Sequence, residues 1–570
     1  MVNIKINDNA IKAKDGSTIL EVARANNIDI PTLCEYEELN CIGACRICMV
    51  EVLGFDRLVA ACNTVVEPGM NILTDSAKVR DARKKNMQLI LSEHNTDCTK
   101  CVRNNNCKLQ DLSEKFNIQD NPYGEKYRSV EWPKNFPLQR DESKCVKCMR
   151  CIQVCDNIQG IHVWDVRNHG TRTSVGIRDG VKIDETKCVL CGQCITHCPV
   201  GALVERDDIQ KVYDAIENPD ITTIVQVAPA VRTAWAEELG LDRKKATPRH
   251  MVAALKKLGF DYVFDTDWSA DLTIMEEGTE FLNRLKHKKD YAWPMFTSCC
   301  PAWVRYLKGH RPDQVKQLSS AKSPQQMFGP AAKELLSKTA GLKKKDIFCV
   351  SIMPCVAKKY ECGVPQMKDV ECSLTVREFQ RMMKTAGIKP SDVKPCDFDS
   401  PLGEATGAAH IFGATGGVME AALRTAYAII MGKNPPADLF KGVRGMDGWK
   451  EAEFTLKGNK IRVAVVHGLV NAEKLLQAID KGEVEYDFVE VMTCPGGCAG
   501  GGGQPIKDQC EQAKDRGKIL YFLDKREKSR FSHENKSVQK IYKDIYGKPL
   551  SKKSHNDFHT DQRKWDFQPH

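Results

Sequence analysis

The sequence contains no long apolar run. No stretch of eighteen consecutive apolar residues occurs in the 570-residue chain, and a membrane-spanning helix is therefore not expected. The first residues, MVNIKINDNAIKA, lack the charged start, apolar stretch and small-residue cleavage site of a signal peptide. No motif gathers the basic residues as in a nucleic-acid-binding protein, and the net charge of +9 is mild for this length. We therefore expect a cytoplasmic protein that binds neither membranes nor nucleic acid.

Cysteine, by contrast, is abundant, with 26 residues. Most of them lie in C-x-x-C groups, and in a cytoplasmic chain this spacing favours metal binding over disulfides. The length predicts several small modules and one large domain. Changes in composition place the expected domains at residues 1–80, 81–140, 141–207 and 208–570.

The strongest cysteine signal is an internal repeat of C-x2-C-x2-C-x3-C between residues 141 and 207. In such repeats each of two [4Fe-4S] clusters takes three thiolates from one run and the fourth from the other. The spacing predicts site A on Cys145, Cys148, Cys151 and Cys198, and site B on Cys155, Cys188, Cys191 and Cys194. A pair of zinc sites is the alternative, although structural zinc usually takes two separated C-x-x-C pairs. This part resembles the two-cluster bacterial ferredoxins.

Residues 1–80 are predicted to form a small β-rich module, since VNIKIN alternates like a strand and DGSTILEVARANNI reads as a turn and a short helix. Its cysteines combine one C-x2-C pair with two distant residues, as in [2Fe-2S] ferredoxins of the plant type. The predicted ligands are Cys34, Cys45, Cys48 and Cys62. Cys41 is a rival for Cys34, but its spacing to Cys45 is cramped, so we favour Cys34.

Residues 81–140 begin as a helix and continue as a polar connector. They contain one histidine and three cysteines, which could bind iron or zinc: His94, Cys98, Cys101 and Cys107. The position of His94 is similar to that in the His-ligated [4Fe-4S] module of large respiratory and hydrogenase subunits, so we expect iron, with zinc as the alternative. Together the N-terminal modules predict electron transfer and no substrate chemistry.

From about residue 210, apolar strand-like segments alternate with helical ones. ITTIVQVAP, KDIFCVSIMP, KIRVAVVHG and YDFVEVMTCP are predicted strands, and PRHMVAALKKLGF and GGVMEAALRTAYAIIMG are predicted helices. This alternation predicts an α/β catalytic domain with parallel strands, preceded by small α+β ferredoxin-like iron–sulfur modules. The polar, basic last fifty or so residues predict a surface helix and tail.

Three cysteine motifs mark the C-terminal half: TSCCPAW from Thr297, MPCVAKKYE from Met353 and EVMTCPGGCAGGGGQP from Glu490. They place four thiolates on three loops, enough for one further [4Fe-4S] cluster. The glycine run permits close backbone approach and would leave room for a bulky group. It lacks the strand-to-helix context and the later acidic residue of a dinucleotide-binding loop, and no NAD or flavin site is visible.

Together with FGATGG from Phe412 and Gln325 in SAKSPQQ, these motifs resemble the catalytic domain of [FeFe]-hydrogenases. The N-terminal modules have the cluster order of the clostridial, monomeric, ferredoxin-linked type, so the resemblance covers nearly the whole chain. It implies an iron-only hydrogenase of anaerobic hydrogen metabolism, which reversibly converts protons and electrons into H2. Electrons would be exchanged with a ferredoxin or flavodoxin through one [2Fe-2S] and three accessory [4Fe-4S] clusters.

The resemblance also implies a catalytic H-cluster, a [4Fe-4S] cluster joined to a two-iron subsite with CO, cyanide and azadithiolate. Its cysteine ligands would be Cys300, Cys355, Cys494 and Cys498, the last bridging to the two-iron subsite. Lys358 would bond one cyanide, and the backbone at Ala228, Pro229 and Ala230 another. Gln325, Met353, Phe412 and Met492 would complete the pocket, and dedicated maturation proteins would load it.

Cys299 lies beside a proposed ligand, and the family motif implies that it donates protons to the cluster. Glu277, Glu280, Arg284 and Ser319 match the family's proton route. The first three lie three and four residues apart, so they share one helix face. The alternatives are a small buried hydrophobe for Cys299 and a surface salt-bridge stripe for the others.

Two other functions are the alternatives to catalysis. An iron–sulfur assembly protein or hydrogen sensor of this fold tends to lose Cys299 or parts of the three motifs, and an electron-transfer subunit of an NAD-linked complex lacks those motifs. Cys299 and all three cysteine motifs are present in this chain, which favours the enzyme. Six cysteines have no predicted role and are expected to be core or incidental: Cys41, Cys349, Cys362, Cys372, Cys396 and Cys510.

Overall fold

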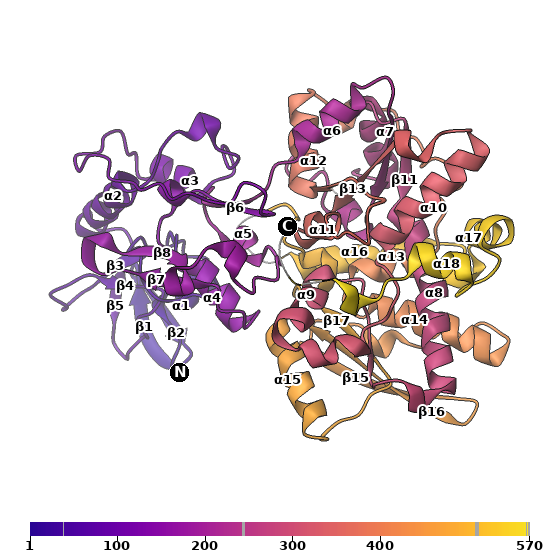
Figure 1. The fold of residues 1–570 in the computed structure, drawn as a ribbon. Helices are drawn as coiled ribbons and strands as arrows, with labels where there is room; N and C mark the ends of the chain where they lie inside the picture. Colours follow the sequence, from indigo (N-terminus) through magenta and orange to yellow (C-terminus); the bar gives the residue numbers. More distant parts are fainter. Residues whose placement is uncertain (38, 242–244, 508–511, 566, 568–570) are drawn as a thin grey trace.

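The computed structural model shows two lobes that meet along one face (Figure 1). It describes residues 1–37, 39–241, 245–507, 512–565 and 567, so Cys510 lies outside the described residues. The smaller lobe, indigo to purple in Figure 1, contains the N-terminal modules, and the larger lobe contains the chain from about residue 208. None of the helices in the described ranges has the length and apolar character needed to cross a membrane.

The first module is a five-stranded sheet with helix α1 (Ile19–Ala25), which confirms the predicted strand and helix. The strand order is β2-β1-β5-β3-β4. The bounds are β1 (Val2–Ile6), β2 (Asn9–Ala13), β3 (Met49–Val52), β4 (Val59–Ala60) and β5 (Asn71–Leu73). Helix α1 begins after Thr18 because Thr18 and Glu21 form a capping box, each side chain accepting from the other's backbone N–H.

The cysteine repeat folds as two matching loop-and-helix units. Helix α4 (Arg150–Asn157) follows the first loop and α5 (Gln193–His197) the second. Two short antiparallel pairs flank them: β6 (Leu138–Arg140) with β9 (Leu203–Glu205), and β7 (Trp164–Arg167) with β8 (Ser174–Ile177). Equivalent positions of both loops have positive φ, at Lys147 and Met149 and at Leu190 and Gly192. Alternating left-handed residues turn successive N–H groups inward, an arrangement typical of iron–sulfur and other anion sites.

Helices α2 (Ala77–Ser92) and α3 (Lys108–Lys115) lie on either side of the His94 segment. The predicted helix at the start of residues 81–140 is therefore confirmed, although it begins at Ala77. The residues between α3 and β6 carry no helix or strand, as expected for the polar connector.

The larger lobe contains two four-stranded sheets, ordered β11-β10-β13-β14 and β12-β17-β16-β15. All strand pairs are parallel except the β15–β16 hairpin. The first sheet has β10 (Thr222–Val227), β11 (Tyr262–Asp265), β13 (Ile347–Met353) and β14 (Cys372–Thr375). The second has β12 (Met295–Phe296), β15 (Trp449–Leu456), β16 (Asn459–His467) and β17 (Phe488–Met492). The predicted α/β domain is confirmed, and its four predicted strands are β10, β13, β16 and β17.

Helices surround both sheets (Figure 1). The two predicted helices are α7 (Pro248–Leu258) and α14 (Gly417–Met431). Others near the site are α8 (Thr266–Lys286), α9 (Pro301–His310), α10 (Pro324–Thr339), α11 (Ala357–Glu361), α12 (Val376–Thr385) and α16 (Ala513–Arg526).

The C-terminal segment is not a surface tail, so that prediction was wrong. Helix α17 (Lys536–Ile541), the π-helix η15 (Tyr542–Tyr546) and α18 (Lys552–Phe558) lie beside α8 and α10 (Figure 1). Val538, Ile541, Tyr542 and Phe558 are buried in the core there. These few apolar residues recur at helical spacing within a lysine-rich sequence, which hides them from a reading of composition.

Candidate functional site

One cavity in the larger lobe is lined by the residues that follow five strands of the two sheets. The segments after β10, β11, β12, β13 and β17 all reach it, as expected for parallel strands whose carboxyl ends share an edge. Its lining includes Cys299, Cys300, Cys355, Cys494 and Cys498. The other predicted pocket residues line the same cavity: Ala228, Pro229, Ala230, Gln325, Met353, Lys358, Phe412 and Met492.

The glycine run packs the third cysteine motif against the second. A Cβ on Gly501 would lie 2.0 Å from the Pro354 carbonyl oxygen, and one on Gly503 would lie 2.6 Å from the Cys355 nitrogen. The predicted close approach of the backbone is therefore present. Gly501 also lines the cavity beside Cys498, so the glycine run contributes to the open space as well as to the close backbone contact.

The donors and the surroundings of this cavity fit an anionic iron–sulfur group. Four thiols from three loops face a lining that is otherwise mostly alanine, proline, methionine and phenylalanine. No three His, Cys, Asp or Glu side chains in the described part of the chain converge on a position suited to a single metal ion. Thiols that bind the corners of a cluster lie around a shared space and do not converge on one point. Burial raises the pKa of Cys355 and of Cys498 to about 12.

Lys358 supplies the positive charge in this lining. Its Nζ forms an ion pair with Glu361 Oε2 at 2.8 Å and donates to the Cys299 carbonyl oxygen at 3.2 Å. Gln325 Nε2 donates to the same Glu361 oxygen at 3.0 Å. Sequence reasoning missed Glu361, although it lies within the second motif and three residues after Lys358. Thr266 and Ala270 of α8 also line the cavity and were missed, since no motif marks them.

Cys299 and the proposed proton residues form a buried series. Ser319 Oγ donates to Glu280 Oε2 at 2.8 Å, and Arg284 donates to Glu280 Oε1 at 2.5 Å. Glu277 is 1% exposed and Arg284 6%, which excludes the surface-stripe alternative. Burial raises the pKa of the Cys299 thiol well above its ordinary value, so the thiol keeps its proton, with the Glu277 charge contributing.

Glu277 is a buried carboxyl group with no hydrogen bond to either side-chain oxygen among the described residues. Burial raises its pKa to about 8, and the nearby Glu280 charge adds to this. The Ser319 hydroxyl and the Ser298 backbone N–H lie close enough to offset part of the shift. Glu277 therefore carries a proton near neutral pH, as a proton-transfer group must.

The structure brings predicted site A together. Cys145, Cys148, Cys151 and Cys198 line one small cavity. The thiols of site B also lie close together, since, beyond burial, the charges of Cys155, Cys188 and Cys191 all raise the pKa of Cys194. In both cases the residues fit a cluster that bridges the two runs.

In the first module, Cys34 lies beside Cys45, whereas Cys41 is exposed. The Cys34 N–H donates to Cys45 Sγ at 3.4 Å, and the Cys45 N–H donates to Cys34 Sγ at 3.5 Å. Cys48 and Cys62 are buried, and each acts on the pKa of the other through a side-chain hydrogen bond. This geometry favours Cys34 over Cys41.

His94 is oriented as a metal ligand would be. Its Nδ1 lies 2.9 Å from the Lys144 carbonyl oxygen, which only accepts, so Nδ1 carries the hydrogen and Nε2 is left for a metal. Two of its predicted partners lie against the second cysteine run: Cys101 Sγ would be 2.5 Å from a Cβ on Gly201, and Cys107 Sγ lies 3.9 Å from the Pro199 carbonyl oxygen. The His94 segment therefore adjoins site A.

Site B lies directly against the catalytic cavity. Cys191 lines that cavity, and its carbonyl oxygen is 4.0 Å from Cys494 Sγ. A Cβ on Gly502 would lie 2.2 Å from the same oxygen and 2.6 Å from the Gly192 Cα. Gln193 Nε2 donates to the Gly500 carbonyl oxygen at 2.9 Å. The glycine run thus also allows the two lobes to touch through their backbones.

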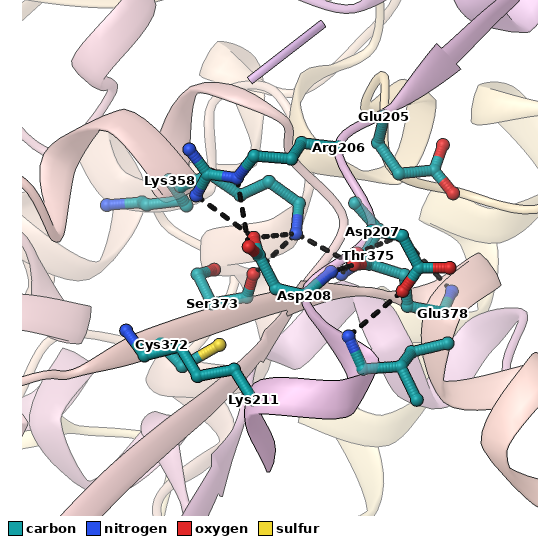
Figure 2. A network of polar contacts seen from close by, with 12 residues as sticks. Glu205, Arg206, Asp207, Asp208, Lys211, Lys358, Cys372, Ser373, Thr375 and Glu378 are labelled. Carbon is teal, nitrogen blue, oxygen red and sulfur yellow. Dashed lines mark hydrogen bonds and ion pairs between the residues drawn. The ribbon is translucent and has the colours of Figure 1, made fainter. Parts of the chain in front are cut away.

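A buried ionic network holds the segment between the lobes against β14 and α12 (Figure 2). Arg206 and Asp208 come from this segment, and they form an ion pair at 2.9 Å. Lys359, whose side chain is fully buried, contacts Asp208 Oδ2 at 2.7 Å and Glu378 Oε1 at 2.8 Å. This network was not predicted, and it fixes the residue next to Lys358.

Fold and site define an oxidoreductase in which several iron–sulfur clusters lead to a buried catalytic metal site. Residues 221–502 match the family described as "Iron only hydrogenase large subunit, C-terminal domain", and residues 510–564 match "Iron hydrogenase small subunit". The preceding residues match a 2Fe-2S iron-sulfur cluster binding domain (1–77), the NADH-ubiquinone oxidoreductase-G iron-sulfur binding region (83–122) and a 4Fe-4S dicluster domain (144–202).

Two relatives match nearly end to end. "Iron hydrogenase 1" of Clostridium pasteurianum is 39% identical over 99% of this chain and 100% of its own. "NADP-reducing hydrogenase subunit HndD" of Solidesulfovibrio fructosivorans is 43% identical over 98% of both chains. A solved structure of apo [FeFe]-hydrogenase HydA1 from Chlamydomonas reinhardtii is 38% identical with a TM-score of 0.55, covering 62% of this chain and 98% of that one.

The chain belongs to the [FeFe]-hydrogenase family and is of the clostridial type. It is a hydrogenase that interconverts protons, electrons and H2, with an iron–sulfur electron relay. Its cofactors are an H-cluster and accessory 2Fe-2S and 4Fe-4S clusters. The predictions of family, fold class, activity and cofactors are thus confirmed.

Proposed function

We propose that Cys300, Cys355, Cys494 and Cys498 hold the H-cluster, and that Cys299 delivers protons to it. The observation that carries this assignment is that all five cysteines line one buried cavity. When bound, the H-cluster supplies the iron chemistry that joins protons and electrons as H2. The chain's own residues orient it, exclude water and hold protons.

Lys358 and the backbone from Ala228 to Ala230 would orient the two-iron subsite, since a group held through one cysteine would need further contacts to fix it. Gln325, Met353, Phe412 and Met492 close the pocket around it. Protons pass along Arg284, Glu280, Ser319 and Glu277 to the Cys299 thiol, which the buried series of these side chains supports.

Electrons enter by two branches that converge on site A. One branch is the [2Fe-2S] site of Cys34, Cys45, Cys48 and Cys62, and the other is the [4Fe-4S] site of His94, Cys98, Cys101 and Cys107. Asn40 Nδ2 supports the first branch because it donates to the carbonyl oxygens of Cys34 at 2.7 Å and of Cys148 at 2.8 Å. A cluster at site A would pass electrons to one at site B, and site B would pass them on to the catalytic cavity, which Cys191 also lines. Three accessory [4Fe-4S] clusters and one [2Fe-2S] cluster complete the set, in domains bounded near residues 80, 140 and 207.

The electron carrier is a ferredoxin or flavodoxin, and the enzyme works in the cytoplasm after loading by maturation proteins. The likeness to a relative named as a subunit of an NADP-reducing hydrogenase favours a second candidate, in which partner subunits connect this chain to NADP. Purification of the native protein separates the two. A single chain that turns over with ferredoxin supports the first, and a complex that reduces NADP with H2 supports the second.

The test of the site uses matured protein, reduced viologen and the variants Cys299→Ala and Cys396→Ala. Infrared bands of CO and cyanide should be present in both variants, because neither residue is a proposed ligand. H2 evolution should nearly vanish in Cys299→Ala and persist in Cys396→Ala, whose side chain lies outside the cavity. Normal H2 evolution by Cys299→Ala would remove this thiol from the proton route.

A further inference from the structure

The C-terminal segment pairs with the strand-like stretch that carries Ser319. The Lys322 N–H donates to the Phe558 carbonyl oxygen at 2.8 Å, and the Thr560 N–H donates to the Ser320 carbonyl oxygen at 2.8 Å. Ala321 and His559 form the antiparallel bridge between them. This contact joins the part of the chain that matches the small-subunit family to the proposed proton route.

His559 lies at the centre of this contact, and its side chain is fully buried. Its Nδ1 is 2.8 Å from Ser320 Oγ, and its Nε2 is 3.0 Å from Glu276 Oε2. Glu276 also accepts hydrogen bonds from Tyr542 Oη at 2.6 Å and from the Leu550 N–H at 2.9 Å. Both ring nitrogens and both carboxylate oxygens are therefore satisfied, which makes the network rigid and costly to break.

Ser320 connects this network to Glu280. The Ser320 N–H donates to the two carboxylate oxygens of Glu280 at 3.2 and 3.1 Å, while Ser320 Oγ meets His559. These contacts form a linkage that runs from Glu276 through His559 and Ser320 to Glu280. Glu276 and Glu280 lie four residues apart on α8, so the linkage begins and ends on one face of this helix. The position of the Glu280 carboxylate thus depends on Ser320, and that of Ser320 depends on His559.

We propose that His559, held by Glu276, is a positioning residue that fixes Ser320 and, through its N–H, the Glu280 carboxylate of the proton route. The C-terminal segment is then part of proton delivery. This inference rests on the proposed route through Glu280. Proton transfer requires heavy atoms within about 2.6–3.2 Å of one another, so small displacements of Glu280 from Ser319 slow it.

The experiment compares His559→Asn, Ser320→Ala, Ser320→Thr and Glu280→Gln in matured holoenzyme. The matched control is His533→Asn, because His533 belongs to the same C-terminal segment but contacts Asn434 and Thr425 instead of the route. H2 evolution from reduced viologen is measured in H2O and D2O, together with the infrared bands of CO and cyanide. Amide hydrogen exchange of the segment around Ser320 is followed by mass spectrometry.

His559→Asn and Ser320→Ala should each lower turnover about tenfold, raise the solvent isotope effect and speed exchange around Ser320, with the infrared bands unchanged. Ser320→Thr keeps the hydroxyl and should restore the rate. The double variant His559→Asn/Ser320→Ala should be no slower than the slower of its two single variants, since both substitutions act through one linkage. His533→Asn should match the wild type in all measurements.

Wild-type rates and isotope effects in Ser320→Ala would overturn the proposal, and this variant decides the matter should His559→Asn fail to fold. A Glu280→Gln variant with normal turnover would instead refute the proton route itself. Impaired Glu280→Gln beside unimpaired His559→Asn and Ser320→Ala would leave the route standing and remove only the positioning role.

Discussion

Glu277 offers the sharpest physical test of the buried proton route, through the variant Glu277→Gln. Burial raises the pKa of Glu277 from its ordinary value of 4.5 to about 8. Between these pH values the folded chain keeps a proton that the unfolded chain releases. The contribution of this group to stability is therefore present in full below about pH 4.5 and is lost as the pH rises toward 8.

The size of the effect follows from the pKa difference. Each unit of pKa corresponds to about 1.4 kcal/mol, so from pH 5 to pH 7 Glu277 should cost the folded state roughly 2–3 kcal/mol. Glutamine has nearly the same shape and no ionisable proton, and it removes this dependence. Relative to Glu277→Gln, the wild type should thus lose about that much stability over this pH range.

Anaerobic thermal unfolding of both proteins at pH 5, 6 and 7 measures the difference, with Glu114→Gln as a control because Glu114 is exposed on α3. Infrared spectra should also show a protonated carboxyl band at pH 7 that Glu277→Gln lacks. A stability difference that stays constant with pH, together with absence of that band, would mean that Glu277 is ionised in the fold. The reasoning about its protonation would then be wrong.

The remaining predictions concern the clusters, the joint between the lobes and the ionic network. Cys34→Ser should abolish the [2Fe-2S] paramagnetic signal while Cys41→Ser keeps it, and the reverse result would reassign the ligand. Gly502→Ala should slow carrier-driven turnover and lower the unfolding temperature by overpacking the joint, whereas Gly442→Ala, which meets open space, should do neither. Lys359→Met should cost about 3–5 kcal/mol of stability by leaving the buried Glu378 carboxylate without its cation, whereas Asp208 keeps its ion pair with Arg206; thermal unfolding measures the loss, and a value below about 1 kcal/mol would refute this.

The cysteine sets of the N-terminal modules could be read from the sequence because a cluster binds thiolates that lie close together along the chain. The conformation of the loops that carry Cys145 and Cys188 is set largely by local sequence, and both loops have left-handed residues at equivalent positions. The parallel strands could be predicted for a similar reason, since apolar runs and their ends are local signals.

The walls of the catalytic cavity could be predicted only through resemblance. Ala230, Gln325 and Phe412 are far apart in sequence, and no spacing rule joins them. Glu361 and Thr266 could not be predicted because no motif marks a role for either residue. Folding pairs Glu361 with Lys358 and places Thr266 in the cavity lining. His559 is the extreme case, since its partners Glu276 and Ser320 lie more than two hundred residues away.

The backbone contact between Gly192 and Gly502 bears on how electrons reach the catalytic centre. Electron tunnelling is sensitive to the distance and the matter between donor and acceptor, and here the two loops meet backbone to backbone at Gly192 and Gly502. Hinge motion of the lobes would have to separate this packed backbone to lengthen the last step. Electron supply at this point should behave as an ungated step, which leaves conformational control of turnover to the movement of protons.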